Sequence, residues 1–216
     1  MEKIPNTKFI LFDFDGTIND SFKYAHLTAN KILESLHKPP LTDEQFEQFR
    51  DKDLQQSIRD LKIPFYKIPG ILRQVQKAFH ENLDKIDVVE GLGELLQRMS
   101  AAGYRMGVLT SNSEANVNNL LEREGILDLF EYIRSEKALF GKAVSMARFY
   151  KIYKLHPEDV IYVGDETRDA RAAKEAGLRI ISVAWGINTL RALQAVDPDY
   201  LVENIQQFEG LFDLAD

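Results

Sequence analysis

The pattern of hydrophobic and polar residues divides this chain into three sections. Residues 7–14 are mostly apolar, which is typical of a buried strand. Between residues 20 and 86, apolar residues instead recur at helical spacing, and this section predicts helices alone. After residue 87, short apolar runs alternate with amphipathic segments, and the alternation predicts strands separated by helices.

Proline residues divide the helical section into separate helices. Pro39 and Pro40 end the first one, which begins near Phe22. Thr42 followed by Gln45 forms a capping box, which predicts the start of a second helix. The rest of the section is expected to form helices over residues 54–61 and 71–83, with a loop over residues 63–70 between them.

The alternating part of the chain predicts a parallel sheet covered by helices on both faces. Its expected strands cover residues 104–109, 130–134, 160–163, 179–184 and 200–202, and its helices cover residues 92–101, 114–124, 142–153 and 169–176, with a terminal helix. The fold class is therefore α/β, a Rossmann-like parallel sheet core with an inserted all-helical domain. We expect residues 1–16 and 87–216 to form the core, and residues 17–86 to form the insertion.

Composition narrows the classes of protein to which the chain can belong. Its 216 residues suffice for one core and a smaller insertion. The net charge is −7 and Lys and Arg are scattered, so we expect no nucleic-acid partner. Cysteine is absent, which excludes disulfides, thiolate zinc sites and a cysteine nucleophile. No apolar run is long enough for a membrane span or a signal peptide, so a cytoplasmic protein is expected.

Two aspartates, Asp13 and Asp15, end the first expected strand. Like charges this close repel each other, and a metal cation is the natural group to offset that cost. A simple turn would not need aspartate at both positions. A calcium loop of the EF-hand type places its glycine sixth, whereas Gly16 is fourth, and a strand rather than a helix enters here.

Polar residues also end two later strands. Thr110, Ser111 and Asn112 follow one of them, and Asp165 and Glu166, with Asp169 further on, follow another. Each group alone is equally consistent with the cap of a following helix. Open parallel sheets bind ligands at the carboxyl ends of their strands, so the groups meet if these strands are neighbours.

Lys142 and the histidines carry weaker signals. The Gly141–Lys142 pair does not form a P-loop, because Glu136 and Ala143 stand where that motif needs glycine and Ser or Thr. A surface lysine is the default interpretation. The four histidines show no ligand spacing and are interpreted as structural or surface groups.

Taken together, these motifs resemble those of the haloacid dehalogenase-like superfamily of phosphohydrolases. The resemblance covers most of the chain and depends on four elements in the family's order: DFDGT (13–17), LTSN (109–112), the lysine of FGK (141–142) and VGDETRD (163–169). The stretch DGTINDS and the region from 181 to 205 are similar to the phosphoglycolate-phosphatase-like branch. The helical insertion looks like the mobile cap of this family.

The resemblance implies a role for each residue of these elements. Asp13 would be the nucleophile, and Asp15 the general acid and then the general base. Thr110, with backbone N–H groups near Ser111 and Asn112, would bind phosphoryl oxygens. The predicted catalytic residues are thus Asp13, Asp15, Thr110 and Lys142, and the phosphate-binding residues are Thr110, Ser111, Asn112 and Lys142.

The same resemblance implies a Mg²⁺ cofactor. Asp13, the backbone carbonyl of Asp15 and Asp165 would bind the ion. Asp169 would hold Lys142 or a metal-bound water, and Glu166 would add a ligand or simply start a helix.

Two departures from the family pattern affect single residues. Many relatives have proline after the lysine, where this chain has Ala143, so Lys137 is a rival for the lysine role. The expected cap does not match the cap sequence of the phosphoglycolate-type enzymes, and within it Arg50 is a speculative contact on the phosphate side.

The leading function is a Mg²⁺-dependent phosphatase for a small phosphorylated metabolite, acting as a monomer or homodimer without a membrane. The alternative is a phosphomutase on a sugar phosphate. Asp15 argues against a dehalogenase, since that branch lacks the second aspartate. A phospho-accepting receiver domain lacks the helical insertion, and a relative without catalysis should have lost a motif residue. The cap is expected to hinge near residues 17–21 and 84–90.

Overall fold

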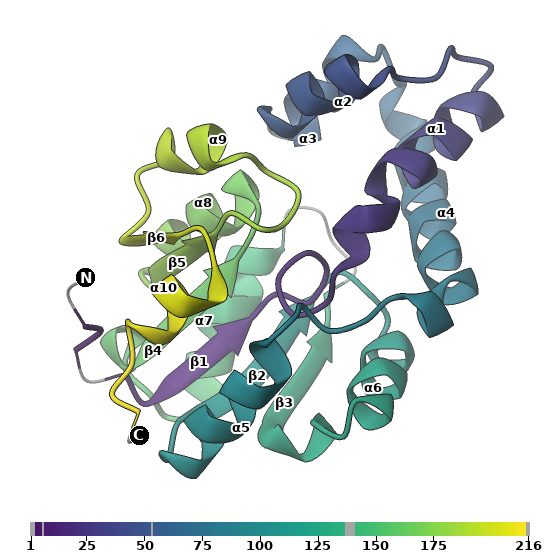
Figure 1. Cartoon of the computed structure of the whole chain (residues 1–216). Helices are drawn as coiled ribbons and strands as arrows, with labels where there is room; N and C mark the ends of the chain where they lie inside the picture. Colours follow the sequence, from purple (N-terminus) through teal and green to yellow (C-terminus); the bar gives the residue numbers. More distant parts are fainter. Residues whose placement is uncertain (1–2, 6, 53, 137–140, 215–216) are drawn as a thin grey trace.

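In the part of the chain that the structure describes, a parallel sheet of six strands forms the centre (Figure 1). The structure is a computed structural model that describes residues 3–5, 7–52, 54–136 and 141–214. The strand order is β3-β2-β1-β4-β5-β6, so the predicted α/β fold with a Rossmann-like sheet is confirmed. The strands are β1 (Phe9–Phe12), β2 (Arg105–Thr110), β3 (Phe130–Ser135), β4 (Val160–Gly164), β5 (Arg179–Val183) and β6 (Tyr200–Val202).

Helices cover both faces of this sheet because successive side chains of each strand point to opposite sides. In β1, Ile10 and Phe12 join the hydrophobic cluster that includes side chains of α5, α6 and α10. Phe9 and Leu11 join the opposite cluster, which includes side chains of α7 and α8. These helices are α5 (Leu92–Ala101), α6 (Glu114–Arg123), α7 (Lys142–Ile152), α8 (Thr167–Ala176) and α10 (Ile205–Glu209).

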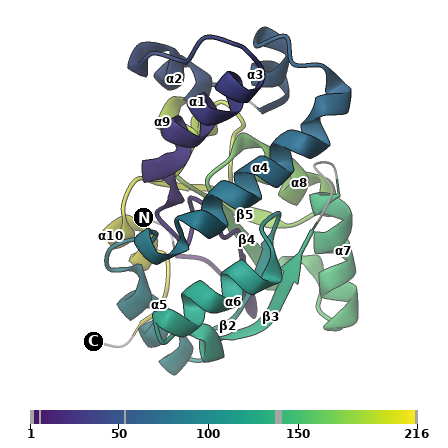
Figure 2. The ribbon, with the colours of Figure 1, turned by 90° about the vertical axis from the view of Figure 1, so that its right-hand side faces the viewer.

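In the section between β1 and α5, the described residues form helices and no strand of the sheet. Its four α-helices are α1 (Ala25–Ser35), α2 (Asp43–Arg50), α3 (Leu54–Asp60) and α4 (Ile68–Glu81), and we call them the cap. They lie beyond the carboxyl ends of the strands, to one side of the sheet (Figures 1 and 2). The division into two domains at residues 17 and 86 stays a prediction. No helix in the described part combines the length and apolar character that a bilayer crossing requires.

Local signals explain where several helices begin. The predicted capping box is confirmed: Gln45 N–H donates to Thr42 Oγ1 at 3.2 Å, and Thr42 N–H donates to Gln45 Oε1 at 2.9 Å. The predicted loop over residues 63–70 was wrong in its last part, because α4 already begins at Ile68. Pro69 is tolerated there, since an N–H in the first turn has no partner within the helix.

One further helix, α9 (Leu190–Gln194), was not predicted. It is only five residues long, too short to show a helical period, although the Thr189 side chain accepts a hydrogen bond from Ala192 N–H as an N-cap.

The two chain crossings that join the cap to the core lie side by side. Asp20 N–H donates to the carbonyl of Asp87 at 2.9 Å, and Val89 N–H donates to the carbonyl of Ile18 at 2.9 Å. The Trp185 indole N–H donates to the carbonyl of Thr17 at 3.1 Å. The crossings are therefore paired with each other, and the expected hinge at these residues stays a prediction.

Candidate active site

The site lies where the strand order reverses, between β2, β1 and β4. Phe12 is in register with Val108 of β2 and with Val163 of β4, so the three strands end together. Asp13 N–H continues the pairing by donating to the carbonyl of Val163 at 2.8 Å. The three polar strand ends thus converge, as neighbouring parallel strands require.

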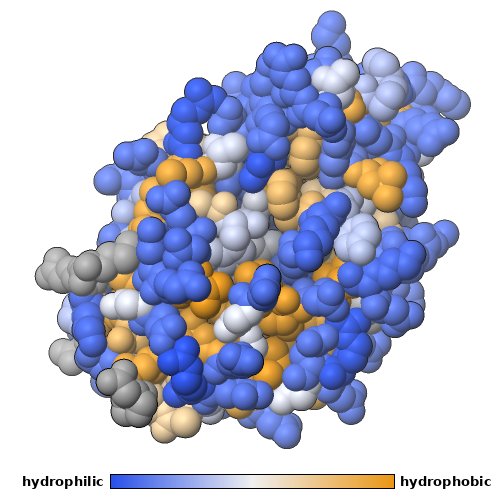
Figure 3. All heavy atoms as spheres, viewed as in Figure 1, coloured by the Kyte–Doolittle hydropathy of each residue, from blue (hydrophilic) through white to orange (hydrophobic). Residues whose placement is uncertain are grey.

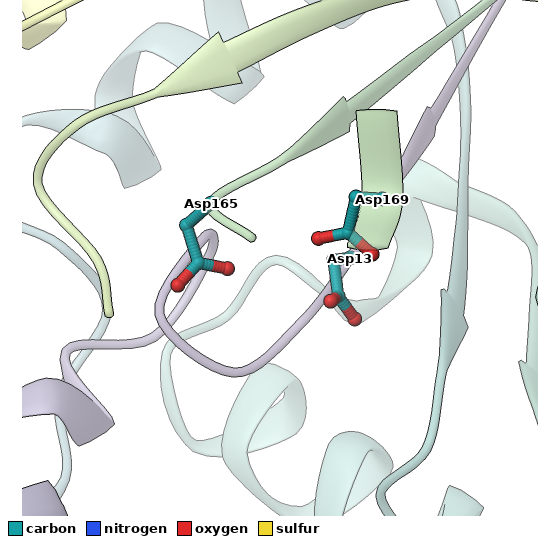
Figure 4. A group of neighbouring side chains, drawn as sticks. All are labelled: Asp13, Asp165 and Asp169. Atoms are coloured by element: carbon teal, nitrogen blue, oxygen red, sulfur yellow. The ribbon is translucent and has the colours of Figure 1, made fainter. Parts of the chain in front are cut away.

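Three buried carboxylates, Asp13, Asp165 and Asp169, form an acidic triad at this point (Figure 4). One oxygen of each lies within 4.8 Å of the other two. Their residues are at most 3% exposed. Asp13 follows β1, Asp165 follows β4 and Asp169 lies in the first turn of α8. Three carboxylates so close in a dry environment need compensating positive charge.

Lys142 supplies part of that charge from the start of α7. Its Nζ lies 2.7 Å from Asp13 Oδ2 and 2.5 Å from Asp169 Oδ1. Burial opposes the charged ammonium, but Asp13 and Asp169 outweigh it, and the pKa of Lys142 is raised. Burial raises the pKa of Asp169 to about 6, against the opposing effect of Lys142. The rival Lys137 lies outside the described residues.

Asp165 has hydrogen bonds but no cation beside it. Its carboxylate accepts from Thr17 Oγ1 at 3.0 Å and from Ile187 N–H at 2.7 Å. No ion pair to Asp165 forms within the described ranges. Burial, followed by repulsion from Glu166 and Asp13, raises its pKa well above the usual range. The charged form of Asp165 is therefore disfavoured unless a further cation lies beside it, and a cluster of carboxylate oxygens fits a hard divalent cation such as Mg²⁺.

Two glycines let the chain close around the Asp165 carboxylate. A Cβ added at Gly16 or at Gly186 would collide with that carboxylate. Gly16 also has φ of 73°, which an L side chain rarely adopts. The sequence reasoning missed Gly186 and the Ile187 N–H, because residues 185–188 match none of the four motifs. A Trp-Gly pair directly after a buried strand is the signal that could have drawn attention to them.

The Asp15 carboxylate lies outside the acidic triad and has its own partners. It accepts hydrogen bonds from Asn19 Nδ2 at 3.1 Å and from Asn112 Nδ2 at 3.0 Å. Burial raises the pKa of Asp15 to about 6, although both hydrogen bonds oppose the shift. A carboxyl group that holds its proton up to mildly acidic pH is suited to donate that proton to a leaving group. The proposed metal ligand at this residue, its backbone carbonyl, stays a prediction.

The end of β2 is organised differently from the expectation. Thr110 is fully buried, and its Oγ1 accepts the Asn112 N–H at 3.0 Å. That N–H, which we expected to bind a phosphoryl oxygen, is therefore engaged within the protein. The Asn112 side chain reaches Asp15, a contact that the motif alone did not predict. Ser111 lies between the two, and its role stays a prediction.

Glu166 takes the second of its two expected roles. It is the N-cap residue of α8, and its N–H donates to Asp169 Oδ2 at 3.2 Å. Its carboxylate pairs with Arg168 at 2.6 Å and is not part of the acidic triad. The geometry favours a helix start over a metal ligand at this position.

Arg50 contacts the core through the loop after β5. Its Nε donates to the carbonyl of Ile187 at 3.0 Å and its Nη2 to that of Gly186 at 3.3 Å. In the opposite direction, Asn188 Nδ2 donates to the carbonyl of Arg50 at 2.6 Å. Asp51 forms an ion pair with Arg191. We call residues 50–52 and 186–191 the cap–core contact. In this structure the expected phosphate-side residue therefore faces backbone carbonyls.

Comparison with known proteins agrees with this geometry. A family model described as haloacid dehalogenase-like hydrolase matches residues 10–183. The phosphoglycolate phosphatase of Synechococcus elongatus is 30% identical over 194 residues, which cover 90% of this chain and 92% of that protein. The pyrophosphatase PpaX of Bacillus velezensis is 28% identical, with coverages of 91% and 92%.

A solved structure shares the fold across nearly the whole chain. The haloacid dehalogenase-like hydrolase of Streptococcus pneumoniae superposes with a TM-score of 0.79 at 20% identity, covering 96% of this chain and 99% of that one. The predicted family, its phosphoglycolate-phosphatase-like branch and the assignment as a hydrolase are confirmed. The chain belongs to the haloacid dehalogenase-like hydrolases.

Proposed function

We propose that this chain is a Mg²⁺-dependent phosphatase that hydrolyses a small phosphorylated metabolite through an aspartyl-phosphate on Asp13. The observation that carries the proposal is the position of the Asp13 carboxylate. It is buried, 2.7 Å from the Lys142 ammonium, and shares a 4.8 Å cluster with Asp165 and Asp169. A carboxylate placed among compensating charges can approach a phosphate dianion, which otherwise repels it.

The acidic triad contains the residues that would hold the metal. Asp13 and Asp165 would be ligands together with the carbonyl of Asp15, and Asp169 would orient Lys142. When bound, Mg²⁺ would neutralise charge on the phosphoryl oxygens during the transfer.

In the first half of the reaction, an Asp13 oxygen attacks phosphorus and the ester bond to the leaving oxygen breaks. Lys142 offsets the negative charge on Asp13 and on the transferred group, because its Nζ already lies beside the attacking carboxylate. The Thr110 side chain, at the end of the neighbouring strand, would bind a phosphoryl oxygen. Asp15 gives its proton to the leaving oxygen, so that a neutral alcohol departs.

In the second half, Asp15 acts as a base. It removes a proton from water, the oxygen attacks phosphorus, and the bond to Asp13 breaks to release inorganic phosphate. The same carboxyl group thus gives a proton in one half and takes one back in the other.

The substrate class follows from the named relatives. Phosphoglycolate and pyrophosphate are both small anions with a transferable phosphoryl group. We therefore propose a small phosphorylated metabolite, with 2-phosphoglycolate as the first compound to test. The relatives named here do not favour a phosphomutase. A cytoplasmic location and a monomeric or homodimeric state stay predictions.

The test is hydrolysis of p-nitrophenyl phosphate with Mg²⁺, with EDTA, and by Asp13→Asn. We expect activity only with the metal and the intact carboxylate, together with a phosphoryl adduct on Asp13 in acid-quenched wild type by mass spectrometry. Asp128→Asn is the matched control, because Asp128 is exposed and far from the triad in sequence. Activity that survives both EDTA and Asp13→Asn would refute the mechanism.

A further inference from the structure

A chain of three side-chain hydrogen bonds runs from the cap to Asp15. Asn112 Nδ2 lies 3.0 Å from Asp15 Oδ1, and Asn116 Nδ2 lies 2.9 Å from Asn112 Oδ1. His80 Nδ1, near the end of α4, lies 3.0 Å from Asn116 Oδ1. Asn116 and His80 belong to none of the motifs and have no part in the mechanism described above.

The direction of each bond can be fixed from one unambiguous donor. The backbone N–H of Ser113 donates to Asn112 Oδ1 at 2.8 Å, so Asn112 must present its Nδ2 to Asp15. Asn112 Oδ1 then also accepts from Asn116 Nδ2, which leaves Asn116 Oδ1 facing His80. His80 must therefore carry its proton on Nδ1 and donate it. All three side-chain bonds point toward Asp15.

Burial makes this arrangement difficult to replace with water. Asn112 is 3% exposed and Asn116 is 4% exposed, and the buried neighbours of Asn116 on α6 include Val117 and Leu120. A buried amide that lacks its partners is costly, so each amide needs the next one in the chain. His80 itself is exposed, but the adjacent Phe79 is buried and packs against Phe14 with ring centroids 6.0 Å apart. That contact holds the end of α4 against the core.

A purely structural role would require only that the buried amides be satisfied. Asn112, however, is bound at its Oδ1 by two donors, and its Nδ2 lies 3.0 and 3.1 Å from the two oxygens of Asp15. Together with Asn19 Nδ2, which lies 3.1 Å from Asp15 Oδ1, the oriented amide restrains the carboxylate plane. If Asn116 is not held, Asn112 keeps a single donor at its Oδ1 and can rotate. The Asp15 carboxylate is then less restrained, because among the described residues Asn19 is the side-chain donor that still holds it.

We infer that Asn116 and His80 are positioning residues that hold Asp15 in the orientation for proton donation to the leaving group. The inference rests on the proposed function and adds residues outside the family motifs to it. Because His80 lies in α4, the chain of bonds also connects the cap to Asp15.

The test compares two aryl phosphates that differ in their para substituent, p-nitrophenyl phosphate and phenyl phosphate, by kcat/KM. The value of kcat/KM includes the steps up to release of the leaving group and excludes the later hydrolysis of the aspartyl-phosphate. Phenol is the poorer leaving group, so its departure depends more on the proton from Asp15. We expect His80→Leu to lower kcat/KM for phenyl phosphate about five-fold more than for p-nitrophenyl phosphate, a fraction of a full general-acid contribution.

Further variants separate positioning from general damage. Asn116→Asp can accept from His80 but, as a carboxylate, cannot donate to Asn112, and should have the larger effect. His80→Asn places an amide donor near the former Nδ1. It should therefore restore the wild-type ratio between the kcat/KM values for the two substrates. The double variant His80→Leu/Asn116→Asp should be no worse than Asn116→Asp alone, since both act through one chain of bonds. Glu81→Gln, in the same turn of α4 and exposed, is the control.

The outcomes distinguish the two proposals. If wild type lacks Asp13-dependent hydrolysis of both esters, the proposed function fails. If wild type is active and every variant keeps the wild-type ratio between the two substrates, the function stands and the positioning role is wrong. Thermal unfolding of each variant shows whether it is folded, and the exposed position of His80 makes it tolerant of change.

Discussion

Ion pairs of the candidate active site and of the cap–core contact lie in different environments. In the site, Lys142 and its partners Asp13 and Asp169 have side chains between 0% and 12% exposed. In the cap–core contact, the side chains of Arg191 and Asp51 are 80% and 24% exposed. The surface over α1–α3 is also mostly hydrophilic in the view of Figure 3. The charges of the Lys142 pairs are therefore shielded from water, whereas those of the Asp51–Arg191 pair are partly solvated.

Because of this difference in exposure, the two sets of ion pairs contribute differently to stability. Breaking a buried ion pair leaves an uncompensated charge and costs about 3–5 kcal/mol. Exposed pairs contribute between about 0 and 1 kcal/mol. The buried pairs can thus hold their groups in a fixed geometry, whereas the exposed Asp51–Arg191 pair adds little to holding the cap on the core. Where side-chain burial is described in α1–α4, the buried apolar residues are Ile32, Leu33, Phe46, Ile68 and Phe79.

The largest effect is expected from Lys142→Met. The substitution leaves Asp13 and Asp169 buried without their cation. Under the proposed mechanism it also removes charge stabilisation from the transferred phosphoryl group. We expect kcat for p-nitrophenyl phosphate to fall about 10³-fold, in the range found for lost electrostatic stabilisation. Lys151→Met is the control, since Lys151 is exposed on the same helix. Equal activity of both variants would show that the buried pair is not needed.

A second experiment measures the cost of burying Asp15. Its pKa is about 6 in the folded protein against 3.8 in the unfolded chain, so the folded state holds the proton more tightly. As pH rises from about 4 to about 6, the unfolded chain loses its proton first and stability falls. Above pH 6 the loss is constant, at most about 3 kcal/mol from the shift.

Asp15→Asn removes this titration and keeps the shape of the side chain. In EDTA, we expect the variant to be more stable than wild type at pH 8, by up to about 3 kcal/mol, and equal to it at pH 4. Urea unfolding at the two pH values gives the comparison. Asp128→Asn, at an exposed position, should show no such difference. Equal stability of Asp15→Asn and wild type at pH 8 would mean that burial does not penalise the charge.

Gly186→Ala probes the point where the two regions meet. The new Cβ would collide with the Asp165 carboxylate, while the Gly186 carbonyl accepts from Arg50 of the cap. We expect the Mg²⁺ concentration for half-maximal activity to rise about 10–100-fold, as for other residues that orient metal ligands. Gly93→Ala is the control, because nothing lies within 4 Å of a Cβ at that position. An unchanged metal requirement would show that Asp165 can move without loss.

The two regions also differ in how far the sequence could predict them. Asp13, Thr110 and Asp165 each end a strand, and regular strand pairing was sufficient to bring them together. Arg50 and Ile187 are 137 residues apart and meet through loops, which have no period from which to infer a contact. The bond between Asn116 and His80 has the same origin, since it depends on how α4 packs beside α6.

The smallest effect, and the sharpest test of the comparison, concerns Asp51 and Arg191. Their ion pair joins cap and core at the surface, and the Thr189 hydroxyl also donates to Asp51. A double-mutant cycle with Asp51→Ala, Arg191→Ala and the double variant should give a coupling below about 1 kcal/mol in stability. KM should rise about two- to three-fold while kcat hardly changes, because a looser cap weakens substrate binding but leaves the buried groups in place. A coupling of several kcal/mol, or a fall in kcat as large as that of Lys142→Met, would mean that the cap is a fixed part of the catalytic structure.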